Sequence, residues 1–336
     1  MSDCKSPCSD YYVFHLIHKE KIGGVEVAVK RSHACINEKI NYRVYSIMSF
    51  QSGEYSYSMF QFFLDLIKYK RKILISSLWY SHLIAFIFSI FSDSWIAFFH
   101  SAAVFHRKDR FGKAIAIWFA DGFFCDSEAT AKFHKLKNFS LIPYVFGSAI
   151  TTEGRRDIDF IFVARADPVK RVDLFIDLIN SLRKEDSSLT AQIYTDDNID
   201  TLLRADQINS LDGYEVFIDA SQSNICRAML RSKFFVSTSE KEGFGSAVAE
   251  AINSGCVPVL TMVGEPINYL DDQTAVYLRS SNGFGKDEIA KITLLLKDTR
   301  LRTQMSGEAI KRLSTYGNYT DKMVLNIRRH IIQTML

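Results

Sequence analysis

The stretch Glu242-Gly-Phe-Gly-Ser-Ala-Val-Ala-Glu250 decides the fold, because a glycine turn lies between two carboxylates eight residues apart. A predicted short strand at 234–239 precedes the stretch. A helix end, a glycine and an apolar run follow it at 251–260. Strand, glycine turn, helix and strand form the unit with which α/β proteins hold phosphate, since the first N–H groups of the helix point at the anion. We therefore expect an anion-binding turn here.

The two carboxylates suit an elongated ligand. At about 1.5 Å rise per residue, Glu250 falls roughly one turn inside the helix, whereas Glu242 precedes it. Between them, the N–H groups of Phe244, Gly245 and Ser246 have no partner within the helix. A nucleotide sugar has hydroxyl groups at both ends and a diphosphate in the middle, and it matches this arrangement.

Composition favours an ordinary protein of two domains. The chain has 336 residues, 47% of them hydrophobic, which is enough for two cores. The net charge is +3, but residues 1–150 hold 18 Lys or Arg against 12 Asp or Glu. This excess indicates either solvated helix ends or a surface facing anionic lipid or an anionic acceptor. Without a long basic run or a nucleic-acid-binding motif, a nucleic-acid partner is not expected.

Compartment and membrane insertion follow from three features. The six cysteines form no metal-like pair, which suits a reducing cytosol. The polar, acidic start of the chain does not resemble a secretory signal. Residues 73–91 are apolar, but they contain four serines and a histidine. A strand and a buried helix explain them better than a membrane span. We expect a cytoplasmic protein, and the basic first half leaves open an association with the inner face of the cell membrane.

Strands and helices alternate along the whole chain. In the first half, strands are expected at 11–17, 41–46, 73–76, 94–100 and 122–125, with helices at 60–69, 80–91 and 111–119. Residues 146–157 form the expected linker. In the second half, strands are expected at 158–164, 191–195 and 214–218, with helices at 172–182, 287–296, 301–313 and 321–336. This alternation predicts parallel sheets with helices on both faces.

A second charged segment, Arg165-Ala-Asp-Pro-Val-Lys170, follows a predicted buried strand. Ligands of such sheets bind beyond the carboxyl ends of the strands, so Arg165 and Lys170 could hold a diphosphate from two sides. The alternative is a pair of surface cations. The acidic pair Asp157 and Asp159 lies at the start of a strand, where we expect Asp159 to be solvated and not to bind a metal.

These motifs resemble the E-x7-E and Arg–Lys elements of retaining GT-B glycosyltransferases of family 4 (group 1) type. The resemblance is strong over 158–275 and moderate over 11–30 and 94–130. It implies an α/β fold with two Rossmann-like domains facing each other across a cleft. The first, at 1–150, would bind the acceptor, and the second, at 151–320, the nucleotide sugar. Helix 321–336 would cross back to the first domain.

The resemblance also implies roles for individual residues. Glu250 would bind the ribose hydroxyls, and Glu242 would fix the donor sugar. The catalytic set would be Glu242, His100, Arg165 and Lys170. The donor-binding set would comprise Gly23, Gly24, Arg165, Lys170, Phe244, Gly245, Ser246 and Glu250. No metal and no cofactor are implied, and the donor would be a UDP-sugar ahead of a GDP-sugar.

Some of these positions have simpler interpretations. His100 follows an apolar strand, where a histidine is often a hydrogen-bonded core residue; otherwise it would bind or polarise a sugar hydroxyl. Ser127 is expected to cap a helix. The chain also departs from the family pattern near the expected nucleotide base. Gln192-Ile-Tyr-Thr-Asp-Asp197 replaces a Gly-x-Gly, and Asp219 stands where a glycine is usual.

The function implied by the resemblance is transfer of a sugar, with retention of configuration, from a nucleotide-diphosphate sugar to a glycan or lipid-linked acceptor. The expected setting is bacterial cell-surface polysaccharide or lipopolysaccharide synthesis. Two rivals stay open. One is a nucleotide-sugar epimerase or hydrolase on the same fold. The other is a catalytically inactive partner that binds a nucleotide or a lipid.

Overall fold

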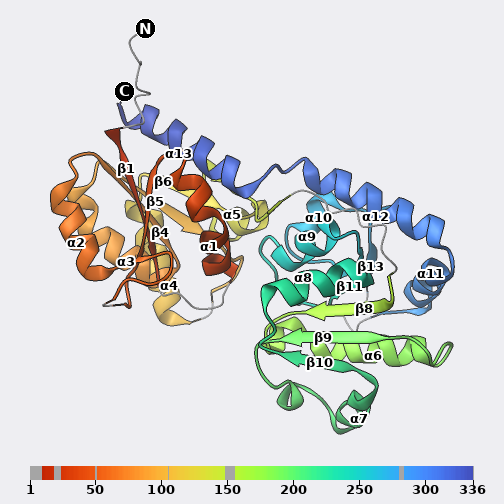
Figure 1. Cartoon of the computed structure of the whole chain (residues 1–336). Coiled ribbons are helices and arrows are strands. Elements are labelled where there is room, and N and C mark those ends of the chain that lie inside the picture. Colours follow the sequence, from red (N-terminus) through yellow and green to blue (C-terminus); the bar gives the residue numbers. More distant parts are fainter. Residues whose placement is uncertain are drawn as a thin grey trace. The chain divides into compact units, whose positions relative to one another are not determined.

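A computed structural model describes residues 10–18, 24–49, 51–104, 106–147, 156–279 and 284–335. The chain forms two compact units (Figure 1). Unit 1 comprises residues 1–144 and 317–336, and unit 2 comprises residues 145–316. Most of the expected linker at 146–157 lies outside the described residues.

Unit 1 is built on a sheet in which seven parallel strands are described, in the order β3-β2-β1-β4-β5-β6-β7. The strands are β1 (Tyr12–Ile17), β2 (Asn41–Ser46), β3 (Tyr57–Ser58), β4 (Lys72–Ser77), β5 (Ser94–Phe99), β6 (Gly122–Cys125) and β7 (Phe139–Leu141). The helices are α1 (Gly24–Asn37), α2 (Met59–Lys68), α3 (Trp79–Phe88), α4 (Arg107–Phe119), α5 (Glu128–His134) and α13 (Tyr319–Met335), with a 3₁₀ turn η2 (Ser89–Phe91).

Unit 2 has a sheet whose described strands are all parallel, in the order β10-β9-β8-β11-β12-β13. The strands are β8 (Ile158–Val163), β9 (Ala191–Thr195), β10 (Glu215–Ile218), β11 (Ser232–Ser237), β12 (Val257–Thr261) and β13 (Val276–Leu278). The longer helices are α6 (Val172–Arg183), α8 (Gln222–Arg231), α9 (Ser246–Asn253), α11 (Lys286–Lys297) and α12 (Thr299–Ser314). Shorter helices are α7 (Ala205–Asn209) and α10 (Pro266–Tyr269), and the 3₁₀ turns are η3 (Pro168–Lys170), η4 (Asp200–Leu202) and η5 (Leu211–Gly213).

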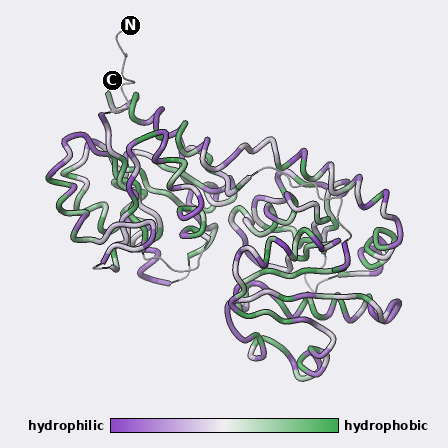
Figure 2. The backbone as a smooth tube through the Cα atoms, viewed as in Figure 1, coloured by the Kyte–Doolittle hydropathy of each residue, from purple (hydrophilic) through white to green (hydrophobic). Residues whose placement is uncertain are grey.

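Burial explains why these strands read as continuous apolar runs. Central strands of a parallel sheet are covered on both faces, so alternation with polar residues disappears. All six residues of β4 and of β5 are buried. Figure 2 shows hydrophobic residues concentrated along the strands of both units. Aromatic rings fill much of each core, as with Trp95 in unit 1 and Phe160, which stacks on Phe234, in unit 2. The α/β class expected from the alternation is confirmed.

The last helix belongs to unit 1 although it ends the sequence. Tyr319 is buried and stacks on Tyr144, with 5.4 Å between ring centroids. His330 Nε2 lies 2.7 Å from Ser94 Oγ, at the start of β5. Lys39, just after α1, pairs with Asp321. Sequence-distant residues therefore complete this core.

Three expectations about local structure need comment. Ser127 caps α5 by accepting a hydrogen bond from Thr130 N–H, as predicted. The helix expected over 80–91 ends at Phe88 and tightens into the turn η2. Asp159 was expected to be solvated, and this is wrong. It is buried, pairs with Lys233 at 2.6 Å and accepts a hydrogen bond from Thr190 N–H.

Nowhere in the described ranges is there a helix with the length and apolar character needed to traverse a bilayer. The apolar residues 73–91 form the buried strand β4, helix α3 and the turn η2. Their interpretation as a strand and a helix is confirmed.

Candidate functional site

The centre of the candidate site in unit 2 is an ion pair between Lys170 and Glu242. Lys170 Nζ lies 2.6 Å from Glu242 Oε1, and the two side chains are only 17% and 19% exposed. The same carboxylate oxygen accepts a hydrogen bond from Ser239 Oγ at 2.8 Å. Two residues that the sequence places 72 positions apart are thus brought into direct contact. An interior that is poor in water strengthens such a pair.

The loops that carry this pair are fixed to each other through the backbone. Lys170 ends η3, and Asp167 caps that turn by accepting from Val169 N–H. Glu240 N–H donates to the Val169 carbonyl at 2.8 Å. Thr238 Oγ1 donates to the carbonyl of Lys170 at 3.0 Å. These hydrogen bonds join the loop after β8 to the loop after β11 at the carboxyl edge of the sheet.

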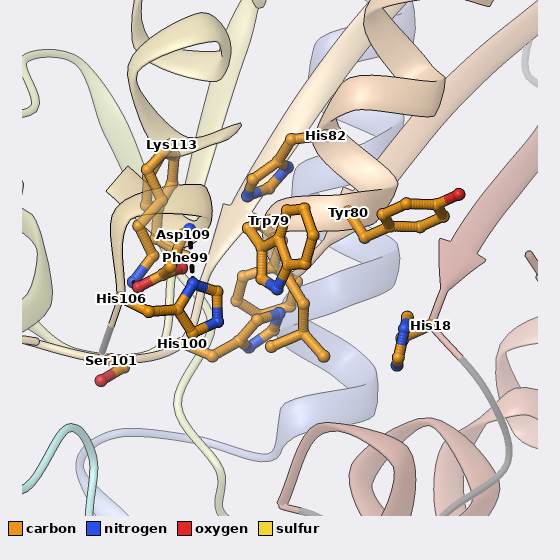
Figure 3. Close-up of a pocket in the computed structure, with 12 residues that line it drawn as sticks. His18, Trp79, Tyr80, His82, Phe99, His100, Ser101, His106, Asp109 and Lys113 are labelled. Atoms are coloured by element: carbon orange, nitrogen blue, oxygen red, sulfur yellow. Dashed lines mark hydrogen bonds and ion pairs between the residues drawn. The ribbon is translucent and has the colours of Figure 1, made fainter. Parts of the chain in front are cut away.

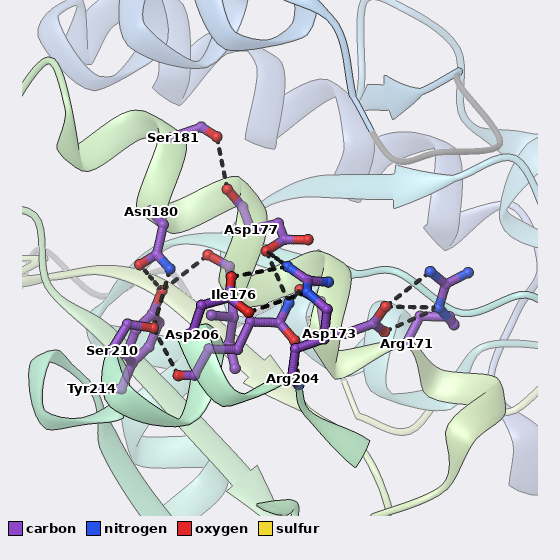
Figure 4. Close-up of polar contacts among 11 residues, drawn as sticks. Arg171, Asp173, Ile176, Asp177, Asn180, Ser181, Arg204, Asp206, Ser210 and Tyr214 are labelled. Carbon is purple, nitrogen blue, oxygen red and sulfur yellow. Dashed lines mark hydrogen bonds and ion pairs between the residues drawn. The ribbon is translucent and has the colours of Figure 1, made fainter.

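Arg171 holds the other side of the Lys170 turn. Its backbone is left-handed, with φ of 51°, which is uncommon for a residue other than glycine. Its guanidinium pairs with Asp173 at 2.9 Å and with Glu240 at 2.9 Å. Figure 4 shows Arg171 and Asp173 at one end of a polar network that continues through Asp177 and Arg204. The network ties the start of α6 to α7, which steadies the turn that carries Lys170.

The glycine turn after Glu242 has the geometry expected of an anion-binding helix start. Gly245 has φ of 75° and immediately precedes α9, which begins at Ser246. The ring of Phe244 is buried and packs against Tyr269 and Tyr316, with centroids 6.3 and 5.8 Å away. Phe244 therefore anchors the turn through its side chain, so that any role in ligand binding would fall to its backbone N–H.

Glu250 is the fifth residue of α9 and is partly buried. Gln222 Nε2, at the start of α8, donates to Glu250 Oε2 at 2.8 Å. The sequence analysis did not single out Gln222. The sequence signal for Gln222 is the preceding Ser221, which is typical of a helix start. Ser221 caps α8, and its Oγ accepts a hydrogen bond from Asn224 N–H.

Gly264 is a second residue that the sequence analysis missed. It has φ of 71°, and a Cβ built on it would lie 2.6 Å from Glu242 Cβ and 2.8 Å from the Gly243 carbonyl. The next residue, Glu265, is buried, and its N–H donates to that same carbonyl at 2.9 Å. The loop after β12 therefore closes directly over Glu242, and only glycine fits there.

The structure gives the remaining predicted site residues of both units fewer contacts or does not describe them. Arg165 follows β8 and is exposed, and among the described residues its guanidinium makes no hydrogen bond or ion pair. The structure does not bring Arg165 to Lys170 by any such contact. Gly23 lies outside the described residues. Gly24 is the first residue of α1. No atom lies within 4 Å of a Cβ built on it, so packing does not require glycine there.

Asp219, which follows β10, has a left-handed backbone conformation. Its φ is 52°, in the left-handed region that glycine adopts most readily. Asp and Asn tolerate this region better than other side chains do. The turn after β10 therefore forms with an aspartate at a position that glycine would adopt more readily.

His100 occupies a separate setting in unit 1, at the end of β5. Its Nε2 lies 2.9 Å from Ser77 Oγ, and its Nδ1 contacts the Tyr144 hydroxyl. Ser77 Oγ also lies 2.7 Å from Nε2 of the buried His15. Burial is the main cause that lowers the pKa of His100 well below its ordinary value, with smaller contributions from neighbours. The imidazole is therefore neutral at neutral pH and both of its nitrogens are engaged.

His100 lines a cavity of about 220 Å³ in unit 1 (Figure 3). Aromatic and imidazole side chains dominate its wall, together with the buried Asp109–Lys113 ion pair. Leu78, between β4 and α3, also lines it and has a strained φ of 73°. Backbone strain of this kind clusters at ligand-binding sites. Histidine side chains in the wall are His18, His82, His100 and His106. Across the described residues, no group of three or more potential metal ligands comes together.

Known proteins resemble this chain in sequence and in fold. Residues 149–312 match the sequence profile of the family described as glycosyl transferases group 1. The UDP-N-acetylglucosamine–peptide N-acetylglucosaminyltransferase GtfA subunit of Streptococcus pneumoniae serotype 4 is 27% identical over 163 residues, which is 45% of this chain. The chain's match covers about a third of that relative's length, 31%.

Solved structures extend the likeness to the whole chain. Anabaena Alr3699/HepE in complex with UDP-glucose has a TM-score of 0.75 at 15% identity, covering 96% of this chain and 99% of that one. Pneumococcal O-GlcNAc transferase GtfA in complex with UDP and GlcNAc has a TM-score of 0.67 at 18% identity, covering 82% and 59%. The chain thus has the GT-B fold, and the match to the group 1 glycosyltransferase profile lies within unit 2. These findings support a transferase enzyme.

Proposed function

We propose that this chain transfers a sugar from a nucleoside diphosphate sugar to a glycan or lipid-linked acceptor. Unit 2 would bind the donor and unit 1 the acceptor. The observation that carries the proposal is the enclosed Lys170–Glu242 pair beside the glycine turn that opens α9. A cation, a carboxylate and a helix N-terminus at the carboxyl edge of a parallel sheet suit a sugar diphosphate.

Each group has a role in this scheme. As the sugar–phosphate bond breaks, negative charge grows on the departing diphosphate. The ammonium of Lys170 and the N–H groups of Gly245 and Ser246 would stabilise that charge. Glu242 would exchange part of its contact with Lys170 for the sugar hydroxyls. Glu250, held by Gln222, would accept from the ribose. Arg165, which is exposed, would complete the diphosphate site when the donor binds.

His100 would bind a hydroxyl group in exchange for one of its present partners, Ser77 or Tyr144, because a neutral imidazole can accept or donate a hydrogen bond. Its contacts with Ser77 and Tyr144 fix the ring. Retention of configuration, reaction without a metal, and a role in bacterial cell-surface polysaccharide or lipopolysaccharide synthesis belong to the same proposal. UDP-sugars are the proposed donors, since the neighbours HepE and GtfA were solved with UDP or UDP-glucose.

The test begins with the donor. Thermal unfolding of the purified chain should be measured with UDP-, GDP- and ADP-sugars in the presence of a chelator. One donor at 100 times its Kd should stabilise the chain by about 2.7 kcal/mol. Lys170→Met should abolish that shift, whereas Lys184→Met, on the exposed end of α6, should leave it unchanged. A chain that no nucleotide sugar stabilises would contradict the proposal.

Analysis of the reaction products distinguishes the proposed sugar transfer from the two alternative functions. With donor alone, a transferase should release sugar slowly, and the rate should rise when acceptor extracts are added. An epimerase or hydrolase would consume the donor at full rate without acceptor. An inactive binding partner would show the thermal shift but no turnover, and Glu242→Gln would then leave glycan assembly in cells unchanged.

A further inference from the structure

Unit 1 exposes a broad apolar surface on the outer sides of three helices and a turn. We call this surface, formed by residues of α2, α3, η2 and α4, the apolar face. Its large side chains are Phe60, Phe63, Leu64, Ile67, Phe86, Ile87, Ile90, Phe91, Phe111, Ile117, Trp118 and Phe119. Ile67, Trp118 and Ile90 are 85%, 82% and 79% exposed. Single exposed apolar residues are ordinary, but a gathering of this size indicates an interaction site.

The helices of the apolar face lie against one another, which makes the surface continuous. Phe63 of α2 contacts Phe88 of α3, with ring centroids 5.2 Å apart. Phe86 of α3 contacts Phe119 of α4 at 4.7 Å. At Gly112, α4 approaches α3 so closely that a Cβ would lie 2.5 Å from the Trp79 carbonyl.

Exposed charge on the helices of the apolar face is positive, whereas the exposed Asp93 and Asp121 follow η2 and α4. The acidic residues of these helices, Asp65 and Asp109, are both buried. Arg43 pairs with Asp65 at 2.7 Å, and Lys113 pairs with Asp109 at 3.1 Å. The exposed charges on the described helices are therefore all positive: Lys68 ends α2, while Arg107, Lys108 and Arg110 lie at the start of α4. Lys70 and Arg71 extend the positive charge beyond α2.

We propose that the apolar face docks on an anionic lipid surface. Aromatic and aliphatic side chains would enter the headgroup region, while the flanking cations would contact lipid phosphates. A second copy fits less well, because the six exposed cations outnumber the exposed carboxylates of Asp93 and Asp121, and a two-fold contact would bring the cations together. The inference depends on the exposed residues of unit 1 and is independent of sugar transfer.

The experiment is flotation of the full chain with vesicles of phosphatidylcholine alone and with added phosphatidylglycerol. We expect binding to the anionic vesicles at least tenfold stronger than to the neutral ones, weakening as salt rises. The triple variant Ile67→Ser, Ile90→Ser and Trp118→Ser should lose at least tenfold in binding. The matched control replaces three exposed apolar residues elsewhere, Leu294, Leu325 and Ile332, by serine and should bind as the natural chain does.

A charge-reversed variant tests the electrostatic part separately. Arg107→Glu, Lys108→Glu and Arg110→Glu together should reduce the preference for anionic vesicles at least threefold, because Lys68, Lys70 and Arg71 remain. Circular dichroism of each variant establishes that it is folded. Failure of the natural chain to float with anionic vesicles would overturn the proposal. So would a concentration-dependent dimer that the serine triple variant dissolves, since this would assign the face to a second copy. Donor-induced thermal shifts should be the same in all these variants. Absence of vesicle binding by the natural chain, with an unchanged donor shift, would therefore contradict lipid docking without contradicting the proposed sugar transfer.

Discussion

At the scale of single residues, the candidate site depends on a charge pair that sequence spacing alone could not reveal. Lys170 and Glu242 each lack other charged neighbours of opposite sign among the ion pairs described, and Ser239 completes the carboxylate's contacts. Removing one partner leaves the other charge in a poorly solvated position. Both binding and stability should therefore respond to changes at either residue.

Replacing Lys170 by Met should lower donor turnover by roughly a hundredfold or more, because a cation aimed at the leaving diphosphate is lost. It should also destabilise unit 2 by about 1–3 kcal/mol, since Glu242 keeps only the hydroxyl of Ser239. Steady-state kinetics and urea unfolding check the two effects. The double variant Lys170→Met with Glu242→Gln should recover part of the stability but none of the turnover. Recovery of both would contradict the assigned role.

Gly264→Ala provides a prediction about shape. A methyl group there would meet Glu242 Cβ at 2.6 Å, on a backbone with φ of 71°. We expect a loss of about 1–3 kcal/mol in the free energy of unfolding, together with weaker donor binding. Gly307→Ala is the matched control, because Gly307 lies within α12 with nothing near its Cβ, and it should stabilise by roughly 0.5–1 kcal/mol. Equal effects of the two substitutions would argue against a tight closure over Glu242.

At the scale of elements, buried histidines on neighbouring strands and helices make unit 1 sensitive to acid. Burial lowers the pKa of His15, on β1, and of His82, on α3, to about 3 each. In the unfolded chain both would titrate near 6.5. The unfolded state therefore binds more protons between pH 6.5 and 3, and stability falls as the pH drops through that window.

The expected loss at pH 5 is about 2 kcal/mol for each of these two histidines, from 1.36 kcal/mol per pH unit. Thermal unfolding of unit 1 at pH 7 and pH 5 measures it. His82→Gln should reduce the difference in stability between pH 7 and pH 5. Glutamine also leaves Ser76 with a polar partner, so the substitution mainly removes the titrating group. His33→Gln, at a partly exposed position on α1, should not change it. A pH dependence that is unaltered by His82→Gln would contradict the burial argument.

At the scale of the whole molecule, the C-terminal helix couples the end of the sequence to the first unit. Tyr319→Ala would remove a ring that is 1% exposed and stacked on Tyr144. We expect unit 1 to lose about 3–5 kcal/mol, as for other buried aromatic truncations. In calorimetry, the transition assigned to unit 1 should move to lower temperature, whereas the transition raised by nucleotide should stay in place. Leu325→Ala, exposed on the same helix, should have little effect.

The sequence by itself determined the alternation of strands and helices, since apolar runs bounded by glycine and polar turns reflect local burial. The strands β2, β6 and β9 fall where the sequence predicts them. The turn at 242–246 and the cap at Ser127 also follow from local chemistry. The sequence could not place Gly264 over Glu242 or Gln222 on Glu250, because contacts between distant loops leave no periodic signal.

Only the tertiary structure decided which charges are enclosed. Asp157 and Asp159 look alike in sequence, yet Asp159 is buried against Lys233 while Asp157 pairs with Arg231 at the surface. Likewise, Arg165 and Lys170 form an equivalent pair of cations by spacing, but the fold encloses Lys170 with Glu242 and leaves Arg165 exposed. Sequence fixes where the chain turns and which stretches must be covered. The burial of a particular side chain depends on which distant elements pack over it, and that is a property of the assembled sheet.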